Sequence, residues 1–552
     1  MPALYFHPEA YTTTGPKLMG RNAAGESFLK GYLRYGSSTQ VVAQIVQPSH
    51  RQPLQDAVTA YAPQKSVVTF GSQDLGALKH HGVSYYPGPG IGEHAWHRSF
   101  YGHGQWSLCG ITHTTSSAAA MDSLSDLLTA PVQPWDAVIC TSQAVKRNVE
   151  TVLQAQVNYL KDRLGVTKLV LPALPVIPLG VHSDEFVLTT AQRELARQSL
   201  GIEPNAVVVL YLGRLSFHAK AHPLAMYQAL AQALPKNNST PVVLIECGWH
   251  ANDHIANAYR QAAALACPAV RVLTLDGRDS TLRGQAWQSA DIFCSLSDNI
   301  QETFGITPIE AMAAGLPVVV SDWDGYKDTV RDNEDGFRIA TAMPAAGLGG
   351  DFASRHALGV DTYDMYCGYT SSLISVDIAQ CAAAFSRLIT DASLRQAMGA
   401  SARARVKSHF DWSVVIGQYE ALWAQLDQIR EQAVAASPAL AKPSIWPARL
   451  DPFLSFAHYA SRTIGLDTNV SPVQATLAQS LDRFDAMSGL TMVNYTQSLL
   501  ISRDEVAKVL EKLHQGTTRL EDLLSVIPKE RQAFVLRGFG WLAKLGIVRI
   551  AA

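Results

Sequence analysis

Short apolar runs rich in β-branched residues recur through the first four hundred residues, and Ala-rich stretches of helical length separate them. The runs are ALYFH (3–7), TQVVAQIV (39–46), SVVTFG (66–71), LCGITHT (108–114), AVICTS (137–142), PVIPLGV (175–181), AVVVLYLG (206–213), PVVLIECG (241–248), VRVLTL (270–275), DIFCSLS (291–297) and LPVVVSD (316–322). Continuous apolar strands separated by helices predict parallel sheets that are covered on both faces. One sheet holding all of them would be too wide, so the sequence predicts an α/β fold with two doubly wound domains that divide near residues 185–200.

Ligands of doubly wound sheets bind at the carboxyl ends of the strands, so two facing sheets predict a binding cleft between the domains. Residues 342–372 interrupt the alternation with a Gly- and Ala-rich stretch, which predicts a functional lid or a disordered excursion. The predicted parts are Rossmann-like domains at 1–190 and 191–400, a helix at 401–432, a linker at 433–450 and a small, mostly helical module at 451–552.

Composition excludes several classes of protein. The 552 residues are 47% hydrophobic and 17% charged, and the net charge of −2 provides no global field for nucleic acid or anionic lipid. Seven scattered cysteines without a CxxC pair indicate reduced thiols in a cytosol rather than a disulfide framework or zinc ribbon. The start, MPALYFHPEAY, lacks the features of a signal peptide, and the longest apolar tract, residues 169–181, is too short and proline-rich to span a bilayer. A cytoplasmic location is expected, with peripheral contact at the inner face of the membrane left open.

The stretch QETFGITPIEAMAAG, residues 301–315, places Glu302 and Glu310 around a Phe-Gly pair and a Thr-Pro pair. Thr307 is predicted to be the N-cap of a helix, with Pro308 at the first helical position and Glu310 at the third, which would complete a capping box. Gly315 is expected to end this helix.

A capping role would explain Glu310 but neither Glu302 nor the Phe304–Gly305 pair that follows a predicted strand. Glycine lets a ligand approach the main chain, and a helix start attracts an anion such as a diphosphate. Two carboxylates beside an anion would be repelled by it unless they bind neutral hydroxyl groups. A nucleotide-sugar offers both, because its diphosphate suits the amides and its hydroxyls suit the acids.

The pattern Glu302-x7-Glu310 within QETFGITPIEAMAAGLPVVVSD closely resembles the signature of the retaining glycosyltransferases of the GT-B fold, family 4. Other segments match in order and spacing. They are the Gly-Arg…Lys phosphate loop in GRLSFHAK (213–220), the interdomain segment VIPLGVHSDEF (176–186), a first-domain strand with its serine in AVICTSQAVK (137–146), and the closing helix FDW…Y (410–419) that crosses back to the first domain. The resemblance covers residues 1–430 and does not reach the last module.

By this resemblance the protein would transfer a sugar from a nucleotide-diphosphate-sugar to an acceptor hydroxyl with retention at the anomeric carbon. Arg214 and Lys220 would hold the diphosphate, Glu302 the hydroxyls of the transferred sugar, and Glu310 the ribose. Backbone amides would come from Phe304, Gly305, Ile306 and Thr307. The resemblance implies no protein nucleophile or base.

Two positions of the first domain, the acceptor side, would face the donor. His113 in GITHTTSS resembles the histidine that touches the donor sugar across the cleft, so it joins Glu302, Arg214 and Lys220 as a candidate catalytic residue. Gly25 lies in LMGRNAAGES, which resembles the glycine loop beside the reaction centre but departs from its short paired-glycine form.

The departing diphosphate must be neutralised either by a divalent ion or by fixed cations and amides. Arg214, Lys220 and the positive end of the helix after Gly305 favour the fixed charges. We therefore expect no metal and no cofactor besides the donor substrate.

The aromatic and histidine-rich residues 85–106 predict either a loop that contacts a sugar acceptor or a packed surface loop. The irregular spacing of His94, His97 and His103 argues against a metal site. The tail reads as helix, turn, helix, helix and short strand, which resembles a winged-helix module. Its prospective reading helix is largely apolar, so packing, homo-oligomer formation or partner binding is expected rather than nucleic-acid binding.

Two other functions stay open. A nucleotide-sugar epimerase would share the architecture but need no acceptor, and the Glu302–Glu310 signature speaks against it. A catalytically degenerate scaffold would act through the C-terminal module, whereas Arg214 and Lys220 are intact. The expected partners are a nucleotide-sugar donor and a carbohydrate or glycoconjugate acceptor.

Overall fold

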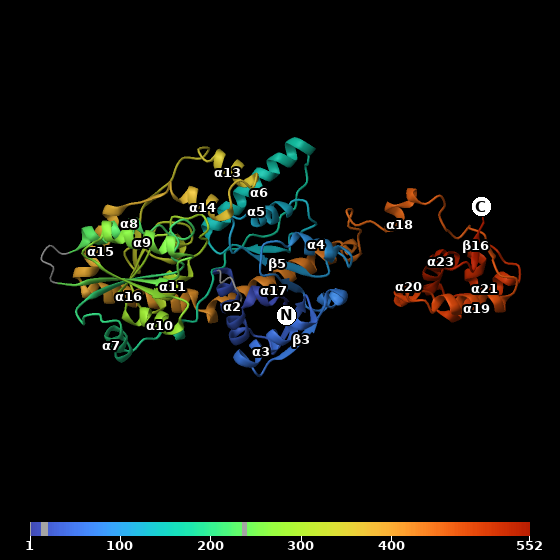
Figure 1. The fold of residues 1–552 in the computed structure, drawn as a ribbon, viewed down its shortest axis with the longest axis horizontal. Helices are drawn as coiled ribbons and strands as arrows, with labels where there is room; N and C mark the ends of the chain where they lie inside the picture. Colours follow the sequence, from blue (N-terminus) through green and yellow to red (C-terminus); the bar gives the residue numbers. More distant parts are fainter. Residues whose placement is uncertain (1, 13–19, 235–239, 552) are drawn as a thin grey trace. The chain divides into compact units, whose positions relative to one another are not determined.

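The computed structural model describes residues 2–12, 20–234 and 240–551. The chain divides into two compact units, Met1–Trp446 and Pro447–Ala552. The first unit contains two six-stranded sheets with helices on their faces (Figure 1).

The first sheet is entirely parallel and has the strand order β3-β2-β1-β4-β5-β6. Its strands are β1 (Ala3–Phe6), β2 (Gln40–Ile45), β3 (Ser66–Phe70), β4 (Val83–Tyr85), β5 (Ser107–Ile111) and β6 (Ala137–Ile139). The helices among them are α1 (Pro8–Tyr11), α2 (Gly20–Tyr35), α3 (Arg51–Tyr61), α4 (Gly92–Ser99), α5 (Ala118–Asp126) and α6 (Gln143–Leu164).

The second sheet is also parallel and repeats this topology in the order β12-β11-β10-β7-β8-β9. Its strands are β7 (Val207–Leu212), β8 (Val242–Gly248), β9 (Arg271–Asp276), β10 (Ile292–Ser295), β11 (Val318–Ser321) and β12 (Gly336–Ile339). Its helices are α7 (Thr190–Ser199), α8 (Leu224–Ala233), α9 (Asp253–Ala266), α10 (Ser280–Ser289), α11 (Ile306–Ala313), α12 (Tyr326–Thr329), α15 (Ile378–Thr390) and α16 (Ala392–Arg405). The two doubly wound sheets confirm the predicted GT-B fold class.

The strand predictions fail at three places. β4 has three residues and β12 has four, including Arg338, so neither forms a long apolar run. The PVIPLGV run makes only isolated bridges among the described residues, because its prolines lack the amide hydrogens that a ladder needs. Its Ile177 and Leu179 are nevertheless buried.

Helix α17 (Trp412–Ala436) returns to the first sheet and packs against α2, β4 and β5. Trp412, Tyr419 and Trp423 of this helix are buried. The indole Nε1 of Trp412 donates to Ser27 Oγ at 2.7 Å. A Cβ on Gly31 would lie 2.7 Å from the Trp412 ring, so glycine lets α2 approach it closely.

Residues 342–372 contain two helices, α13 (Gly350–Ala357) and α14 (Tyr363–Ser371), so the disordered alternative is wrong. The short strands β13 (Thr341–Ala342) and β14 (Ser375–Val376) pair in antiparallel fashion at the base of the segment. Arg355 binds the Asp361 carboxylate through two hydrogen bonds of 2.8 and 2.7 Å. These local contacts order a stretch whose composition suggested a loop.

The second unit has a core of its own, which includes Val506, Leu510, Phe539 and Leu542. Its elements are α18 (Pro452–Ser455), β15 (Val470–Pro472), α19 (Leu477–Ser488), α20 (Thr491–Asn494), α21 (Arg503–His514), α22 (Leu520–Leu523), α23 (Lys529–Lys544) and β16 (Val548–Ile550). β15 and β16 pair in antiparallel fashion. The small, mostly helical C-terminal module is therefore confirmed.

The segment just after α17 packs on the first domain, since the amide of Gly104 donates to Leu440 and the amide of Ser444 to Ser99, both at 2.8 Å. The predicted domain boundaries themselves stay a prediction. Within residues 2–12, 20–234 and 240–551, no helix is both long enough and apolar enough to cross a membrane.

Candidate active site

Lys220 and Glu302 form an ion pair where the neighbouring strands β7 and β10 end, with 2.5 Å between Nζ and Oε2. Burial alone would raise the pKa of Glu302. The charge and hydrogen bond of Lys220, together with the amides of Thr303 and Phe304, hold this pKa below its ordinary value. Two residues predicted from the sequence are thus brought together as a charged pair.

Arg214 lies in the same loop as Lys220 and stiffens it. Its Nη2 donates to the carbonyl of Ala219 at 2.9 Å and to Gln301 Oε1 at 3.4 Å. The end of β8 comes close to this loop, because a Cβ on Gly248 would lie 1.9 Å from the carbonyl oxygen of Gly213. Both predicted diphosphate residues therefore lie in one loop and contact residues 301 and 302.

Helix α11 begins at Ile306, so the predicted capping box is wrong. Gly305 is the N-cap with a φ of 81°, none of the described side chains caps the helix, and Thr307 and Pro308 lie within the first turn. A Cβ on Gly305 would lie 1.9 Å from Cε1 of Tyr326, so both backbone and packing require glycine. The first-turn amides, including those of Ile306 and Thr307, keep donors that an anion can bind.

Glu310 lies in the second turn of α11, too far along the helix to cap it. Burial raises its pKa to about 7, while Arg283 lowers it and Glu185 raises it. A carboxyl group that is partly neutral near pH 7 can both accept a hydrogen bond from a ligand hydroxyl and donate one to it. Ribose binding by Glu310 stays a prediction that this environment suits.

The loop after β10 is tied to the first domain. Thr303 Oγ1 donates to the main-chain oxygen of His113 at 3.0 Å, and Ser142 Oγ donates to the main-chain oxygen of Thr303 at 2.9 Å. The amide of Gln143 donates to Asp328 Oδ2 at 2.6 Å. The structure therefore brings His113 beside the Glu302 loop from the opposite domain.

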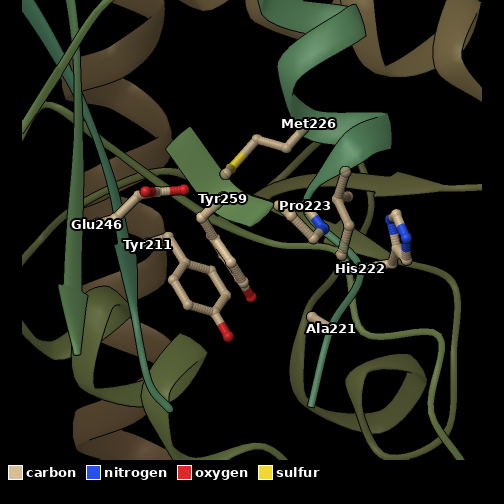
Figure 2. A pocket seen from close by; sticks show the side chains of 8 residues that line it. Tyr211, Ala221, His222, Pro223, Met226, Glu246 and Tyr259 are labelled. Carbon is tan, nitrogen blue, oxygen red and sulfur yellow. The ribbon is translucent and has the colours of Figure 1, made fainter. Parts of the chain in front are cut away.

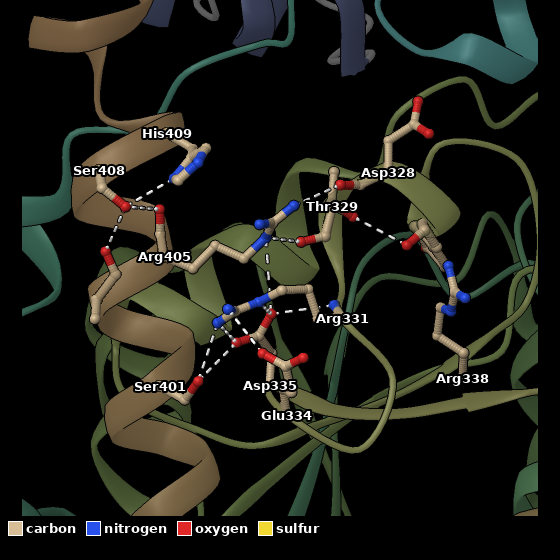
Figure 3. Close-up of polar contacts among 12 residues, drawn as sticks. Asp328, Thr329, Arg331, Glu334, Asp335, Arg338, Ser401, Arg405, Ser408 and His409 are labelled. Carbon is tan, nitrogen blue, oxygen red and sulfur yellow. Dashed lines mark hydrogen bonds and ion pairs between the residues drawn. The ribbon is translucent and has the colours of Figure 1, made fainter.

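A charged network fixes Asp328, the residue that meets the first domain (Figure 3). The buried Asp335 accepts from Arg331 at 2.6 Å, and Arg405 Nε lies 3.7 Å from its other oxygen. Arg405 also donates to the carbonyls of Thr329 and Asp328, both at 2.9 Å. The end of α16 thereby holds α12 in place.

Asp324, which the sequence motifs did not predict, lies three residues beyond the end of β11 with a φ of 44°, in a region that favours glycine. Ser142 Oγ lies 3.5 Å from its Oδ1, and its Oδ2 is buried without a hydrogen-bond partner among the described residues. Burial, followed by the nearby charge of Glu302, raises the pKa of Asp324 well above its ordinary value. The available signal was an aspartate in SDWDG, directly after a predicted strand.

A small pocket lies behind the Lys220 loop, with Tyr211, Glu246 and Tyr259 on one side and His222 and Pro223 on the other (Figure 2). Burial raises the pKa of Glu246 to about 7, even though the hydroxyl of Tyr227 donates a hydrogen bond to it.

Asp298 lies close to this pocket. It accepts a hydrogen bond of 3.3 Å from the amide of His222, and burial raises its pKa to about 7. Glu246 and Asp298 are thus buried acids that neighbour the proposed diphosphate loop.

Gly25 lies inside α2, so the predicted glycine loop is wrong from Gly20 to Gly25. A Cβ on Gly25 would lie 1.9 Å from the carbonyl oxygen of Ala10, which gives this glycine a packing role. The start of the segment, residues 18 and 19, lies outside the described residues. A role of Gly25 in donor binding stays a prediction.

The aromatic segment at 85–106 packs within the first unit. Trp96 stacks on Trp446 with 5.6 Å between ring centroids, and His103 Nε2 lies 3.0 Å from Ser444 Oγ. These contacts favour the packed surface loop over the acceptor loop. His94 stacks on Tyr86, and the described residues contain no group of three His, Cys, Asp or Glu that could hold a metal.

Known proteins resemble this chain in sequence. The family model for glycosyl transferases group 1 matches residues 192–346. The D-inositol 3-phosphate glycosyltransferase of Actinosynnema mirum is 29% identical over 239 residues, which are 42% of this chain and 54% of that protein. The phosphatidyl-myo-inositol mannosyltransferase of Mycobacterium tuberculosis is 32% identical over 170 residues, which are 30% of this chain and 40% of that protein. The chain thus spans about half or less of these curated relatives.

Among solved structures, Anabaena Alr3699/HepE in complex with UDP is similar over 79% of this chain and 100% of that protein, with 16% identity and a TM-score of 0.48. The span matched by the family model contains Arg214, Lys220, Glu302 and Glu310. The match to glycosyl transferases group 1 therefore falls on the second Rossmann-like domain, where these four residues lie.

Proposed function

We propose that this protein is a retaining glycosyltransferase that moves a sugar from a nucleotide-diphosphate-sugar to a hydroxyl of a carbohydrate, glycoconjugate or small-molecule acceptor. The observation that carries the proposal is the Lys220–Glu302 pair beside the first-turn amides of α11. Both curated relatives are named as transferases, which favours transfer over the epimerase alternative.

The ion pair suggests how the contacts of Lys220 and Glu302 change when the donor binds. The diphosphate would draw the ammonium of Lys220 away from Glu302, and hydroxyls of the sugar would replace it as partners of the carboxylate. The amides of Thr303 and Phe304, which also lower the pKa of Glu302, would stay in place and favour the ionised form that accepts from those hydroxyls. Lys220, Arg214 and the α11 amides would stabilise the charge that develops on the leaving diphosphate.

Fixed cations at the diphosphate make a divalent ion unnecessary in this proposal. The acceptor hydroxyl would attack the anomeric carbon from the face that the diphosphate leaves, and its proton would pass to the departing diphosphate. The new bond would then keep the anomeric configuration without a protein nucleophile or base. We place the protein in the cytoplasm, which agrees with its buried, unpaired cysteines.

The first experiment identifies the nucleotide base of the donor. A thermal-shift screen over nucleoside diphosphates should find one that stabilises the protein, because a ligand that binds only the folded state raises its stability. Transfer from the matching nucleotide-sugar should persist in excess EDTA and give a product with unchanged anomeric configuration by NMR. Activity lost in EDTA and restored by manganese would overturn metal independence, and an inverted product would overturn retention.

Lys220→Ala should lower kcat/KM at least about tenfold, which corresponds to about 1.4 kcal/mol for one charge-assisted contact. The exposed Lys327→Ala on α12 is the matched control. Equal values for both variants would remove Lys220 from the mechanism. An epimerised nucleotide-sugar formed without acceptor would favour the epimerase, and a wild type that neither binds nor turns over any donor would favour the scaffold.

A further inference from the structure

Helix α14 lies between the loops of both domains that meet at the proposed donor site. Its first residue is Tyr363, and Thr362 caps the helix by accepting the amide of Met365 at 3.3 Å. On its other side, a Cβ on Gly368 would lie 3.1 Å from Cβ of His218, in the loop that carries Arg214 and Lys220. The segment at 342–372 is thus in close contact with the proposed diphosphate loop.

The hydroxyl of Tyr363 reaches the first domain. It lies 3.0 Å from Ser116 Oγ and 3.3 Å from Thr114 Oγ1, in the loop that follows β5 and contains His113. Cys367, one turn further along α14, is fully buried.

The side chain of Gln301, in the second domain, acts on the same hydroxyl, because a hydrogen bond from it opposes the rise that burial causes in the pKa of Tyr363. Gln301 Oε1 accepts from Arg214 at 3.4 Å, which leaves its amide nitrogen to donate to Tyr363. Since Gln301 directly precedes Glu302, Tyr363 lies between the loops of Glu302 and His113.

We propose that Tyr363 is a positioning residue that fixes the His113 loop against the Glu302 loop, so that both domains hold the donor sugar at once. This inference rests on the proposed function. The Thr303 bond fixes one atom of the His113 loop, whereas Tyr363 fixes two hydroxyls of the residues that follow. Without it, the loop would spend less time in the reactive geometry.

Tyr363→Phe removes only the hydroxyl. It should lower kcat about tenfold, while the Kd of the nucleoside diphosphate and the donor KM stay within about twofold, because the proposed diphosphate residues lie in the second domain. Tyr369→Phe is the matched control, since this tyrosine of α14 is 40% exposed and packs on Phe352. A double-mutant cycle with Ser116→Ala should be non-additive in kcat, because each change removes the same hydrogen bond between Tyr363 and Ser116.

Hydrogen exchange gives a readout independent of turnover. Amides of residues 112–117 should exchange faster in Tyr363→Phe than in the wild type or Tyr369→Phe, without any ligand. Unchanged exchange and kcat in Tyr363→Phe would overturn the inference, as would an equal loss in Tyr369→Phe. Faster exchange in a protein whose wild type binds no nucleoside diphosphate would keep the loop contact but overturn the proposed function.

Discussion

Glu302 and Glu310 have the same side chain but lie in different electrostatic surroundings. Lys220 keeps the pKa of Glu302 below its ordinary value, whereas burial raises that of Glu310 to about 7. Of the two acids, Glu302 is the one paired with a cation, the ammonium of Lys220 at 2.5 Å, in the part of the chain that the structure describes. The two acids therefore suit different hydroxyl partners.

Glu302→Gln should lower turnover at least about tenfold, because the amide replaces the carboxylate that accepts from the sugar hydroxyls. It should not weaken binding of the nucleoside diphosphate, because Lys220 loses its ion-pair partner and can contact the diphosphate. Glu310→Gln should raise the Kd of that nucleotide about tenfold, since donor and product share the ribose contact. Calorimetric titration and steady-state kinetics measure both effects. Equal losses of thermal stability, with binding and turnover intact, would contradict the assignments.

The buried Glu246 should make stability depend on pH. Its folded-state pKa of about 7 lies above its ordinary value of 4.5, so its contribution is fully present below pH 4.5 and is lost as the pH rises through 7. The full loss corresponds to roughly 3 kcal/mol. Urea unfolding should therefore show a free energy that falls between pH 5 and pH 8.

Glu246→Gln should make that decline shallower, because the amide oxygen still accepts from Tyr227 and no longer ionises. The part that remains comes from acids such as Glu310 and Asp298, whose pKa values burial also raises to about 7. The exposed Glu203→Gln serves as control and should keep the wild-type slope. A Glu246→Gln protein with the wild-type slope would exclude Glu246 as the source.

The sequence motif predicted the meeting of Arg214, Lys220 and Glu302, because all three follow strands that are neighbours in a doubly wound sheet. Asp324 and Tyr363 were missed for a physical reason. Their signals are burial, a positive φ and a hydroxyl that bridges two domains, and these appear only when distant segments are packed together.

At the scale of elements, long apolar strands were predicted well and local backbone geometry was not. The start of α11 was misplaced because a glycine with a positive φ, not a side chain, begins the helix. The Gly20–Gly25 stretch was taken for a loop because its glycine content hid a helix that needs Gly25 for contact with Ala10.

Two helical glycines should respond in opposite ways to the same substitution. Gly417 in α17 is exposed, and a Cβ there would meet no described atom within 4 Å, so Gly417→Ala should stabilise the protein by about 0.5–1 kcal/mol. Gly25→Ala would place a Cβ 1.9 Å from a carbonyl oxygen and should lower the unfolding midpoint. Thermal unfolding of both variants tests this, and changes of the same sign in the two unfolding midpoints would contradict it.

The whole molecule consists of two units that fold around separate cores. The two-sheet architecture could be predicted because apolar strand runs recur along the sequence. The helical structure of residues 342–372 could not be predicted, because it depends on ion pairs such as Arg355 with Asp361 and on contacts with His218.

A chain that ends at Trp446 should have the unfolding midpoint of the full chain and should still hydrolyse the donor slowly. A chain that ends at Ala436 should have a midpoint several degrees lower, because it loses the stacking of Trp446 on Trp96 and the contacts of Leu440 and Ser444. Loss of acceptor use or of oligomeric state in the longer chain would assign that property to the C-terminal module. An insoluble or donor-inert longer chain would show that this module belongs to the catalytic fold.

The return of α17 to the first sheet also determines when the core of the first domain becomes complete during translation. The strands of the first sheet emerge first, yet Trp412, Tyr419 and Trp423 of their core are translated only after the whole second sheet. The second domain is continuous in sequence up to α16, so it can fold while the first domain still exposes apolar surface. Chaperones bind such exposed apolar surface. A chain that ends before residue 412 would contain every strand of both sheets but would lack these three residues of the first domain's core.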